Sequence, residues 1–344
     1  PDMHLLGETS GKNAIIVTPS ADPDLAVRDI VHSAFAHAGQ KCSASSLLIL
    51  VGSAGRSTRI ARQLVDATAS LRVGLPASLD SQVGPVVVPD DEKAVRGLTT
   101  LGEGEHWVLK PRYLGDGLWT PGIRAGVVPG SEFHLTEYFA PVLGVMRVKT
   151  LEEAIEAVNE VDYGLTSGLH TLDTEELAMW LDGIEAGNLY VNRGITGAVV
   201  RRQPFGGWKR SAIGSTTKAG GPSYLLGLGE VEAAREAAVG ESTMDTATLA
   251  PSVHALCHAA SAHLSSDEVV ELGGAVANDA AAWARAYGVG RDVTAMACER
   301  NILRYRPTPV LVRAASGTTL VDTVRVLAAG VLAGGPIGLS LADA

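Results

Sequence analysis

A cysteine in a run of small residues is the feature of this chain with the clearest chemical meaning. Cys42 stands in the segment GQKCSAS, residues 39–45. Small neighbours leave room for a substrate carbon to reach the sulfur, and they leave backbone N–H groups free to face a developing oxyanion. Exposed amides near the end of a helix also favour the thiolate. The pattern therefore predicts that Cys42 is a reactive thiol, although most cysteines are small buried hydrophobes.

The elements on either side of Cys42 follow an α/β pattern. The apolar run Ala14–Val17 predicts a buried strand, and Pro23 begins a helix whose apolar spacing continues until Gly39 ends it. Leu47–Val51 predicts the next buried strand. Cys42 is therefore expected on a helix-to-strand connection, and loops on α/β scaffolds usually present the reacting groups.

The alternation of strands and helices continues beyond this region. Helices are expected over 57–71, 151–158 and 173–187, strands over 163–171 and 188–192, and a turn that enters a strand over 84–88. This order predicts an α/β domain with a layered, largely parallel sheet.

The composition changes after Gly229, where we place the end of the first domain. Residues 230–250, rich in Ala, Glu and Thr, are expected to form a linker or an exposed helix. Helices over 252–263, 267–287 and 320–332, with strands over 309–313 and near Ile337, predict a smaller C-terminal α/β unit. The chain is thus divided into domains 1–229 and 251–344, joined by 230–250.

The overall composition narrows the classes of function. The chain has 344 residues, enough for two domains, with 46% hydrophobic and 19% charged residues. A formal net charge of −10 argues against a nucleic-acid partner. The three cysteines show neither a disulfide framework nor metal-ligand spacing, so we expect no metal and a reducing cytoplasm. The sequence shows no signal peptide and no apolar run long enough for a transmembrane segment.

Four segments, taken in order, resemble the catalytic half of an aldehyde dehydrogenase: ETSGKN at 8–13, GQKCSAS at 39–45, TEYFAPV at 136–142 and QPFGGWK at 203–209. The resemblance implies that Cys42 is the nucleophile and that Glu8, 34 positions earlier, activates the water that hydrolyses the thioester. It also implies that Glu137 hydrogen-bonds the nicotinamide ribose of NAD and that Phe139 packs beside the nicotinamide. The chain is thereby expected to be an NAD-dependent enzyme.

A more specific resemblance concerns the substrate, a small-molecule aldehyde. The segments NRGITGA at 192–198 and KAGGP at 218–222 are similar to those of L-glutamate-γ-semialdehyde dehydrogenases, also called Δ1-pyrroline-5-carboxylate dehydrogenases. This resemblance implies that backbone N–H groups of Gly197 and Ala198 hold the α-carboxylate of the substrate. Ser43 would add a hydroxyl donor, and Phe205 would cover the aliphatic middle of the substrate. The implied reaction is oxidation of L-glutamate γ-semialdehyde to L-glutamate with NAD⁺, in proline catabolism.

The C-terminal unit carries a weaker resemblance. ERNILRYRP at 299–307 is similar to the accessory aldehyde-dehydrogenase-like domain of bifunctional proline utilisation enzymes, which is not catalytic. Members of the family have a Rossmann-type domain before the base, and no glycine-rich dinucleotide turn precedes Glu8. We therefore expect a larger polypeptide that adds an N-terminal dinucleotide-binding domain and a proline dehydrogenase domain. We also expect a homo-oligomer, and no oxidation of the semialdehyde by these residues alone, although cleavage of an activated ester through Cys42 needs no cofactor.

Other functions stay open from the sequence. The chain could be a truncated, non-catalytic remnant or assembly module, or an aldehyde dehydrogenase with another substrate. It could also be a cysteine hydrolase, because a thiol and a water-activating carboxylate cleave activated esters without NAD.

Overall fold

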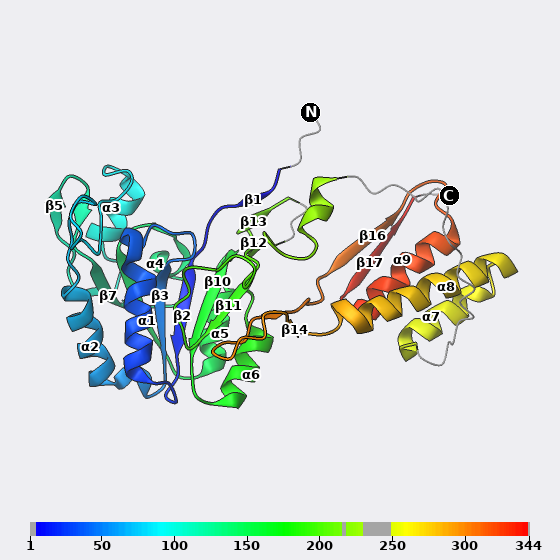
Figure 1. Ribbon diagram of the computed structural model, residues 1–344, viewed down its shortest axis with the longest axis horizontal. Coiled ribbons are helices and arrows are strands. Elements are labelled where there is room, and N and C mark those ends of the chain that lie inside the picture. The colour runs from blue at the N-terminus through cyan, green and yellow to red at the C-terminus, as the bar shows by residue number, and fades with distance from the viewer. Residues whose placement is uncertain (1–4, 215–217, 230–248, 343–344) are drawn as a thin grey trace. The chain divides into compact units, whose positions relative to one another are not determined.

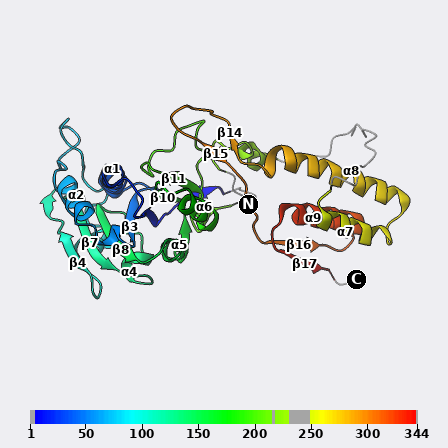
Figure 2. The same ribbon diagram turned by 90° about the horizontal axis from the view of Figure 1, so that it is seen from below.

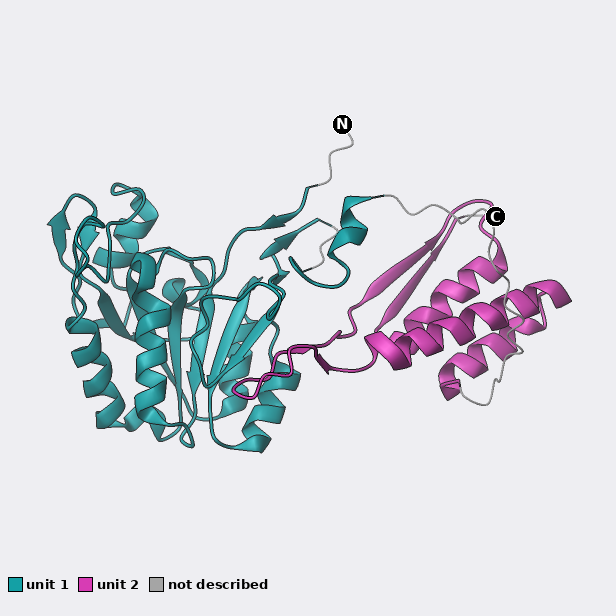
Figure 3. Cartoon of the chain, viewed as in Figure 1, with its two compact units in different colours: residues 1–230 teal, residues 231–344 magenta. Residues whose placement is uncertain are grey.

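The computed structural model describes residues 5–214, 218–229 and 249–342. The chain divides into two compact units, Pro1–Glu230 and Val231–Ala344, which are described one at a time (Figure 3). Of the linker expected over residues 230–250, residues 230–248 lie outside the described residues, whereas Leu249 is buried and Ala250 precedes α7. The structure of the rest of the linker therefore stays a prediction.

A seven-stranded sheet forms the centre of the first unit (Figure 1). Six neighbouring strands run parallel, and β4 closes one edge antiparallel to β7. The predicted α/β class with a layered, largely parallel sheet is confirmed. Across the sheet the strands are β11 (Asn188–Val191), β10 (Thr166–His170), β2 (Asn13–Val17), β3 (Ser45–Val51), β8 (Val142–Val148), β7 (Gly122–Val127) and β4 (His106–Leu109).

Helices cover both faces of this sheet. α1 connects β2 to β3, whereas α5 connects β8 back to β10 in the opposite direction across the sheet. Because such crossovers are right-handed, the two helices must lie on opposite faces, as Figure 2 shows. The helices are α1 (Pro23–Phe35), α2 (Thr58–Ala69), α3 (Glu92–Thr99), α4 (Glu132–Leu135), α5 (Leu151–Asn159) and α6 (Thr174–Gly183), with 3-10 turns η1 (Ala36–Gly39), η2 (Ala54–Arg56) and η3 (Tyr224–Leu228).

Short antiparallel pairs lie outside the main sheet. These pairs connect loops to one another, and each strand in them is only two or three residues long. The pairs are β1 (Gly7–Glu8) with β13 (Ala212–Ile213), β5 (Tyr113–Gly115) with β6 (Leu118–Trp119), and β9 (Tyr163–Gly164) with β12 (Trp208–Lys209).

Local side chains explain where α1 begins and ends. The Asp22 side chain accepts hydrogen bonds from the backbone N–H groups of the first turn, and Pro23 suits the first helical position. The sequence predicts this start correctly. The α-helix ends at Phe35, before the expected end at Gly39, because His37 and Ala38 already adopt left-handed backbone angles.

The structure corrects the sequence analysis in the middle of the first unit. Residues 84–88 form no strand; the adjacent Val83 makes only an isolated bridge to Val73. The strand expected over 163–171 is divided into β9 and β10. Strands β7 and β8 were not predicted, because glycines such as Gly126 and Gly144 interrupt their apolar pattern.

The core of the first unit follows from helices on both faces of a parallel sheet, which bury every position of β2 and β10 and most positions of β3 and β8. Residues Ala14–Val17 are at most 1% exposed. Phe35 of α1 and Trp180 of α6 are fully buried. The continuous apolar runs that predicted these strands are therefore the part of the sequence that forms the core.

The second unit has its own small core, made by helices that pack on one another. Its three α-helices match the expected segments closely, except that the helix expected over 267–287 changes to a π-helical turn at Trp283. No described helix of either unit is long and apolar enough to cross a bilayer. The elements are α7 (Pro251–Ser261), α8 (Ser266–Ala282), the π-turn η5 (Trp283–Tyr287), β14 (Arg291–Asp292), β15 (Ile302–Leu303), β16 (Val310–Ala314), α9 (Leu320–Ala333) and β17 (Ile337–Leu341).

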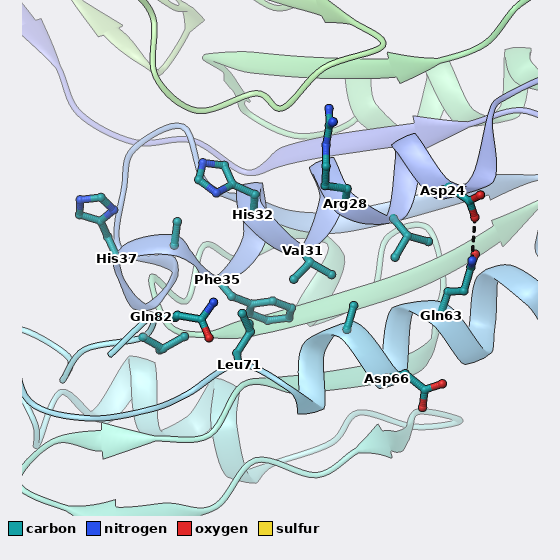
Figure 4. Close-up of a pocket in the computed structure, with 14 residues that line it drawn as sticks. Asp24, Arg28, Val31, His32, Phe35, His37, Gln63, Asp66, Leu71 and Gln82 are labelled. Atoms are coloured by element: carbon teal, nitrogen blue, oxygen red, sulfur yellow. Dashed lines mark hydrogen bonds between the residues drawn. The ribbon is translucent and has the colours of Figure 1, made fainter. Parts of the chain in front are cut away.

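A cavity of about 770 Å³ lies between α1 and α2 (Figure 4). Apolar side chains such as Val31, Phe35 and Leu71 line its floor. At one end Gln63 of α2 donates a hydrogen bond of 2.7 Å to Asp24 of α1. Cys42 is not among the lining residues, so this cavity is separate from the predicted reactive thiol.

A buried lysine, Lys12, lies directly before β2. Its Nζ is 4.1 Å from the centroid of the Phe133 ring, and the residue is only 4% exposed. Among the described residues this ammonium has no hydrogen-bond partner. Burial, assisted by the Arg124 guanidinium and opposed by nearby carboxylates, lowers the pKa of Lys12 to about 7.

Lys12→Met should stabilise the fold, because it removes a buried charge. An unfolded lysine keeps its proton up to about pH 10, whereas folded Lys12 releases it near pH 7. Between these values the unfolded state binds the extra proton, so wild-type stability rises with pH and the advantage of the variant shrinks. Urea unfolding should show a gain of about 1–4 kcal/mol at pH 6 and a smaller gain at pH 9. Lys110→Met, at an exposed position, is the control; a loss of stability in Lys12→Met at pH 6 would contradict the argument.

Candidate active site

The predicted nucleophile and the predicted cofactor residues gather at the amino ends of the parallel strands. Cys42 lies in the turn between η1 and β3, and Glu137 and Phe139 lie between α4 and β8. Strands β2, β3 and β8 are neighbours in the sheet, so the segments that enter them meet at one edge. Open α/β sheets more commonly bind ligands at the carboxyl edge.

Asn13, the first residue of β2, fixes the cysteine turn. Its Nδ2 donates hydrogen bonds to the carbonyls of Cys42 (2.7 Å) and Ala44 (3.0 Å). Its Oδ1 accepts one of 3.0 Å from the N–H of Thr166, where β10 begins. Asn13 is 2% exposed, so these bonds are shielded from water. One side chain therefore holds the cysteine turn and two strands in register.

Gly11 brings the Glu137 carboxylate close to the cysteine turn. The Gly11 N–H donates a bond of 3.1 Å to Glu137 Oε1. A Cβ at Gly11 would lie 2.6 Å from the Cys42 carbonyl oxygen, so only glycine allows this approach. From the other side, Gln40 donates a bond of 3.0 Å to the Phe139 carbonyl. These contacts bring the two predicted cofactor residues next to the predicted nucleophile.

The backbone on both sides of this contact is left-handed. His37, Ala38 and Gly39 have φ of 56°, 54° and 67°, and Phe139 has φ of 53°. Non-glycine residues hold such angles at a cost of about 1–3 kcal/mol each, so the surrounding packing must enforce them. The strained segments are the ones that carry Cys42 and Phe139 into the site.

The thiol of Cys42 is half-buried and its pKa is raised. Burial is the main cause, and the carboxylates of Glu137 and Glu8 raise it further. The N–H groups of Ser43 and of Cys42 itself hydrogen-bond to the sulfur and oppose the shift. The predicted preference for the thiolate is thus not supported: the amides face the sulfur as expected, but burial outweighs them.

Glu8 reaches the site from the short strand β1. The N–H of Gly207 donates a bond of 2.9 Å to Glu8 Oε2. Loss of water around the carboxyl raises the pKa of Glu8, although the Gly207 N–H and the Lys218 ammonium lower it. Because the Glu8 charge acts on Cys42, the predicted base and nucleophile lie within electrostatic reach of each other.

The predicted substrate residues are less closely grouped. Ser43 is adjacent to Cys42 and 5% exposed, with its carbonyl accepting a bond from Thr166 Oγ1 (3.5 Å). Gly197 is exposed with φ of 83°, and Ala198 is half-buried, on the loop that follows β11. Phe205, half-buried, pairs with Ala219 in an isolated bridge. The loop that carries Gly197 and Ala198 continues to Gly207, which donates a hydrogen bond to Glu8.

Three polar residues of the site were given no role by the sequence analysis. They are Asn13, Gln40 and Lys218, each of which bonds to backbone groups of another segment. Their position within the recognised motifs is the only sequence signal for them. Within the described residues, no group of three or more His, Cys, Asp or Glu side chains could hold a metal ion.

Comparison with known proteins defines the class. Residues 3–230 match the model of the aldehyde dehydrogenase family. This match covers more than half of the chain, so the chain belongs to the aldehyde dehydrogenase family, as the resemblance predicted.

Individual relatives are more specific. The 1-pyrroline-5-carboxylate dehydrogenase of Geobacillus sp. (strain WCH70) is 35% identical over 225 residues, which are 64% of this chain and 43% of that protein. Proline utilization A (PutA) from Corynebacterium freiburgense is 45% identical with a TM-score of 0.84, covering 97% of this chain and 33% of its own. A Thermus 1-pyrroline-5-carboxylate dehydrogenase with bound NAD is 39% identical with a TM-score of 0.58, covering 64% of this chain and 42% of its own. The chain thus spans less than half the length of these relatives.

Asn13→Leu should loosen the cysteine turn. The variant leaves two carbonyls and one N–H without their buried partner, at about 1–3 kcal/mol for each group. The thiol should then become more exposed, so its pKa should fall and iodoacetamide should alkylate Cys42 faster at pH 7. Peptide mass spectrometry measures the rate, and urea unfolding measures the stability. Asn159→Leu breaks a similar pair of bonds, to Gly183 and Glu185, and should cost stability without changing the Cys42 rate. Equal rates in both variants would contradict this role for Asn13.

Glu137→Gln should lower the pKa of the Cys42 thiol, because it removes a negative charge that disfavours the thiolate. A glutamine oxygen still accepts the Gly11 N–H, so the loop should be retained. The pH midpoint of Cys42 alkylation should therefore move to lower pH. Glu156→Gln, on the exposed side of α5, is the control and should leave the midpoint in place. An unchanged midpoint in Glu137→Gln would show that the charge does not reach the sulfur.

Proposed function

We propose that this chain carries the catalytic half of an L-glutamate-γ-semialdehyde dehydrogenase, which oxidises the semialdehyde to L-glutamate with NAD⁺. The observation that carries the proposal is the arrangement of the site: Gly11 joins Glu137 to the Cys42 turn, and the Gly207 N–H holds the Glu8 carboxylate. The membership of the aldehyde dehydrogenase family supports the reaction type, and the names of the 1-pyrroline-5-carboxylate dehydrogenases support the substrate.

The first step is attack of the Cys42 thiolate, whose proton has passed to solvent water, on the aldehyde carbonyl carbon. A carbon–sulfur bond forms and the carbonyl oxygen takes the negative charge. The backbone N–H groups of Cys42 and Ser43, which face the sulfur, are placed to donate to that oxygen. NAD⁺, when bound, supplies the hydride acceptor that turns this adduct into a thioester on Cys42.

The second step is hydrolysis of the thioester with Glu8 as general base. The carboxylate takes a proton from water, the water oxygen bonds to the thioester carbon, and the carbon–sulfur bond breaks to release the acid and the Cys42 thiolate. The hydrogen bond from Gly207 holds one carboxylate oxygen and so orients the group. The raised pKa of Glu8 makes it a stronger base than an ordinary carboxylate.

The residues for NAD suit only its nicotinamide end. The Glu137 carboxylate can accept hydrogen bonds from ribose hydroxyls, and the Phe139 ring offers an apolar face. Both line a small cavity of about 10 Å³, which is about the space of one water. They can therefore contact one edge of the cofactor and cannot enclose it.

The substrate is held at two points in this proposal. Its aldehyde carbon lies at Cys42, and its α-carboxylate accepts hydrogen bonds from the backbone of Gly197 and Ala198. A Cβ at Gly197 would meet open space, so this loop is accessible to a ligand. The Ser43 hydroxyl and the Phe205 ring complete the contacts with the polar end and the aliphatic middle.

The second unit is assigned an accessory role. The similarity to PutA extends over 97% of this chain and so reaches beyond the part that matches the aldehyde dehydrogenase family. We assign catalysis to residues 1–229, a linking role to 230–250, and an accessory, non-catalytic domain to 251–344.

Hydrolysis of p-nitrophenyl acetate tests the thiol and the base without NAD. The wild-type chain should release a burst of p-nitrophenol as Cys42 is acetylated, followed by steady turnover. Glu8→Gln should keep the burst and slow the steady phase by about 10²–10⁴-fold, the usual loss for a general base. Mass spectrometry should then find acetyl-Cys42 accumulating.

Cys42→Ala removes the burst if Cys42 is the nucleophile, and Glu156→Gln is the matched exposed control. Unchanged turnover in Glu8→Gln would remove Glu8 from the mechanism. Protection of Cys42 from alkylation by L-glutamate, but not by D-glutamate, tests the substrate class.

A further inference from the structure

Lys218 lies beside the proposed base and uses all of its hydrogen-bonding capacity. Its Nζ donates to the carbonyls of Gly187 (2.6 Å) and Gly206 (2.5 Å) and to Asn188 Oδ1 (3.0 Å). An ammonium has three N–H donors and a neutral amine has two. The complete set of bonds therefore requires the charged form of Lys218.

Asn188 bonds both to Lys218 and to residues 204–206. This loop directly precedes Gly207, the hydrogen-bond donor to Glu8. Asn188 Oδ1 also accepts a bond of 3.1 Å from the Gly206 N–H, and its Nδ2 donates one of 3.0 Å to the Pro204 carbonyl. Asn188 is the first residue of β11 and is 7% exposed. The loop 204–206 is thus held against the rigid sheet by one lysine and one asparagine.

The same loop supports Glu8 directly. Gly207, the next residue, donates its N–H to the Glu8 carboxylate. A Cβ at Gly206 would lie 3.0 Å from Glu8 Oε1 and 3.2 Å from Lys218 Cα, so Gly206 lies between these two residues. A side chain at Gly206 would therefore separate the carboxylate from the lysine.

Charge links the two side chains as well. The Glu8 charge interacts with both Lys218 and Cys42. The Lys218 ammonium lowers the pKa of Glu8, and Glu8 in turn raises that of Lys218. Burial is the larger effect on the lysine and lowers its pKa to about 8. At neutral pH Lys218 therefore still carries its charge next to Glu8.

We propose that Lys218 is the positioning residue for the general base: it holds the Gly206–Gly207 backbone that orients Glu8, and it places a positive charge beside that carboxylate. Lys218 does not touch the substrate in this role. The inference rests on the proposed function of Glu8. It adds a residue whose loss should slow deacylation and leave the attack by Cys42 intact.

Lys218→Met and Lys218→Arg test the proposal in the full chain with p-nitrophenyl acetate. In Lys218→Met the burst should be retained, whereas deacylation at pH 7 should fall by about 10–100-fold, the size of effect expected when a catalytic group is misplaced. The lower pH midpoint of deacylation should also move to higher pH, because Glu8 loses its neighbouring cation. Lys218→Arg keeps the charge and should keep this midpoint.

The wild-type profile should also decline above a pH near 8, where Lys218 releases its proton and one of its three bonds. In Lys218→Arg this decline should move to higher pH, since arginine stays charged. This measurement keeps the test valid if Lys218→Met does not fold.

Lys209→Met is the matched control. Lys209 also donates to two backbone carbonyls, those of Asn159 (2.5 Å) and Val161 (3.2 Å), but its carboxylate partner is Glu185. Its loss should reduce stability in urea without moving the deacylation midpoint. If the deacylation midpoint of Lys209→Met moved as far as that of Lys218→Met, a general loss of stability would explain both shifts and the role of Lys218 would be overturned.

The outcomes separate the two proposals. If Glu8→Gln deacylates at the wild-type rate, the proposed function fails and this inference fails with it. If Glu8→Gln is slow but folded Lys218→Met and Lys218→Arg keep the wild-type rate and pH profile, only the role of Lys218 is overturned. Circular dichroism and urea unfolding establish that each variant is folded.

Discussion

The buried side-chain amide of Asn13 is the interaction on which the candidate active site depends. A turn such as the one that carries Cys42 cannot satisfy all of its backbone groups within a sheet, so its carbonyls need donors from elsewhere. Asn13 supplies two of these donors and uses its oxygen to hold β10. Because β2 lies between β3 and β10, the Asn13 amide connects three neighbouring strands at their amino ends. The cysteine turn lies at these ends.

The position of the site at the amino edge follows from the type of loop that carries it. Cys42 follows a helix and precedes a strand, and such connections lie at the amino ends of parallel strands. The loop after β11, in contrast, begins at the carboxyl end of that strand. It nevertheless returns along the sheet, because Ile195 N–H bonds to Ser33 of α1 and Asn188 binds the later residues of the loop. This return path brings Gly207 to Glu8.

Burial explains the electrostatics of the whole site. It raises the pKa of Cys42, Glu8 and Glu137 and lowers that of Lys12 and Lys218, so every shift favours the neutral form. Lysine charges oppose this effect on each carboxylate: Lys218 acts on Glu8, and Lys93 and Lys12 act on Glu137. Paired charges of opposite sign let a partly dry site keep two carboxylates ionised near a thiol.

The elements with continuous apolar runs, their α/β order and the family could all be predicted from the order of residues. The sequence also identified Cys42, Glu8, Glu137 and Phe139 as candidates, because local motifs and spacing carry that information. Strands β7 and β8 were not found, since glycines interrupt their pattern, and the strand expected at 84–88 does not form. Tertiary structure alone decided that Asn13 holds the cysteine turn, that burial raises the pKa of Cys42, and that Lys218 lies beside Glu8. These features depend on contacts between segments far apart in the chain and on the exclusion of water. The hydrogen bond from Gly207 to Glu8, for example, joins residues 199 positions apart. Neither the contacts nor the loss of water can be read from neighbouring residues.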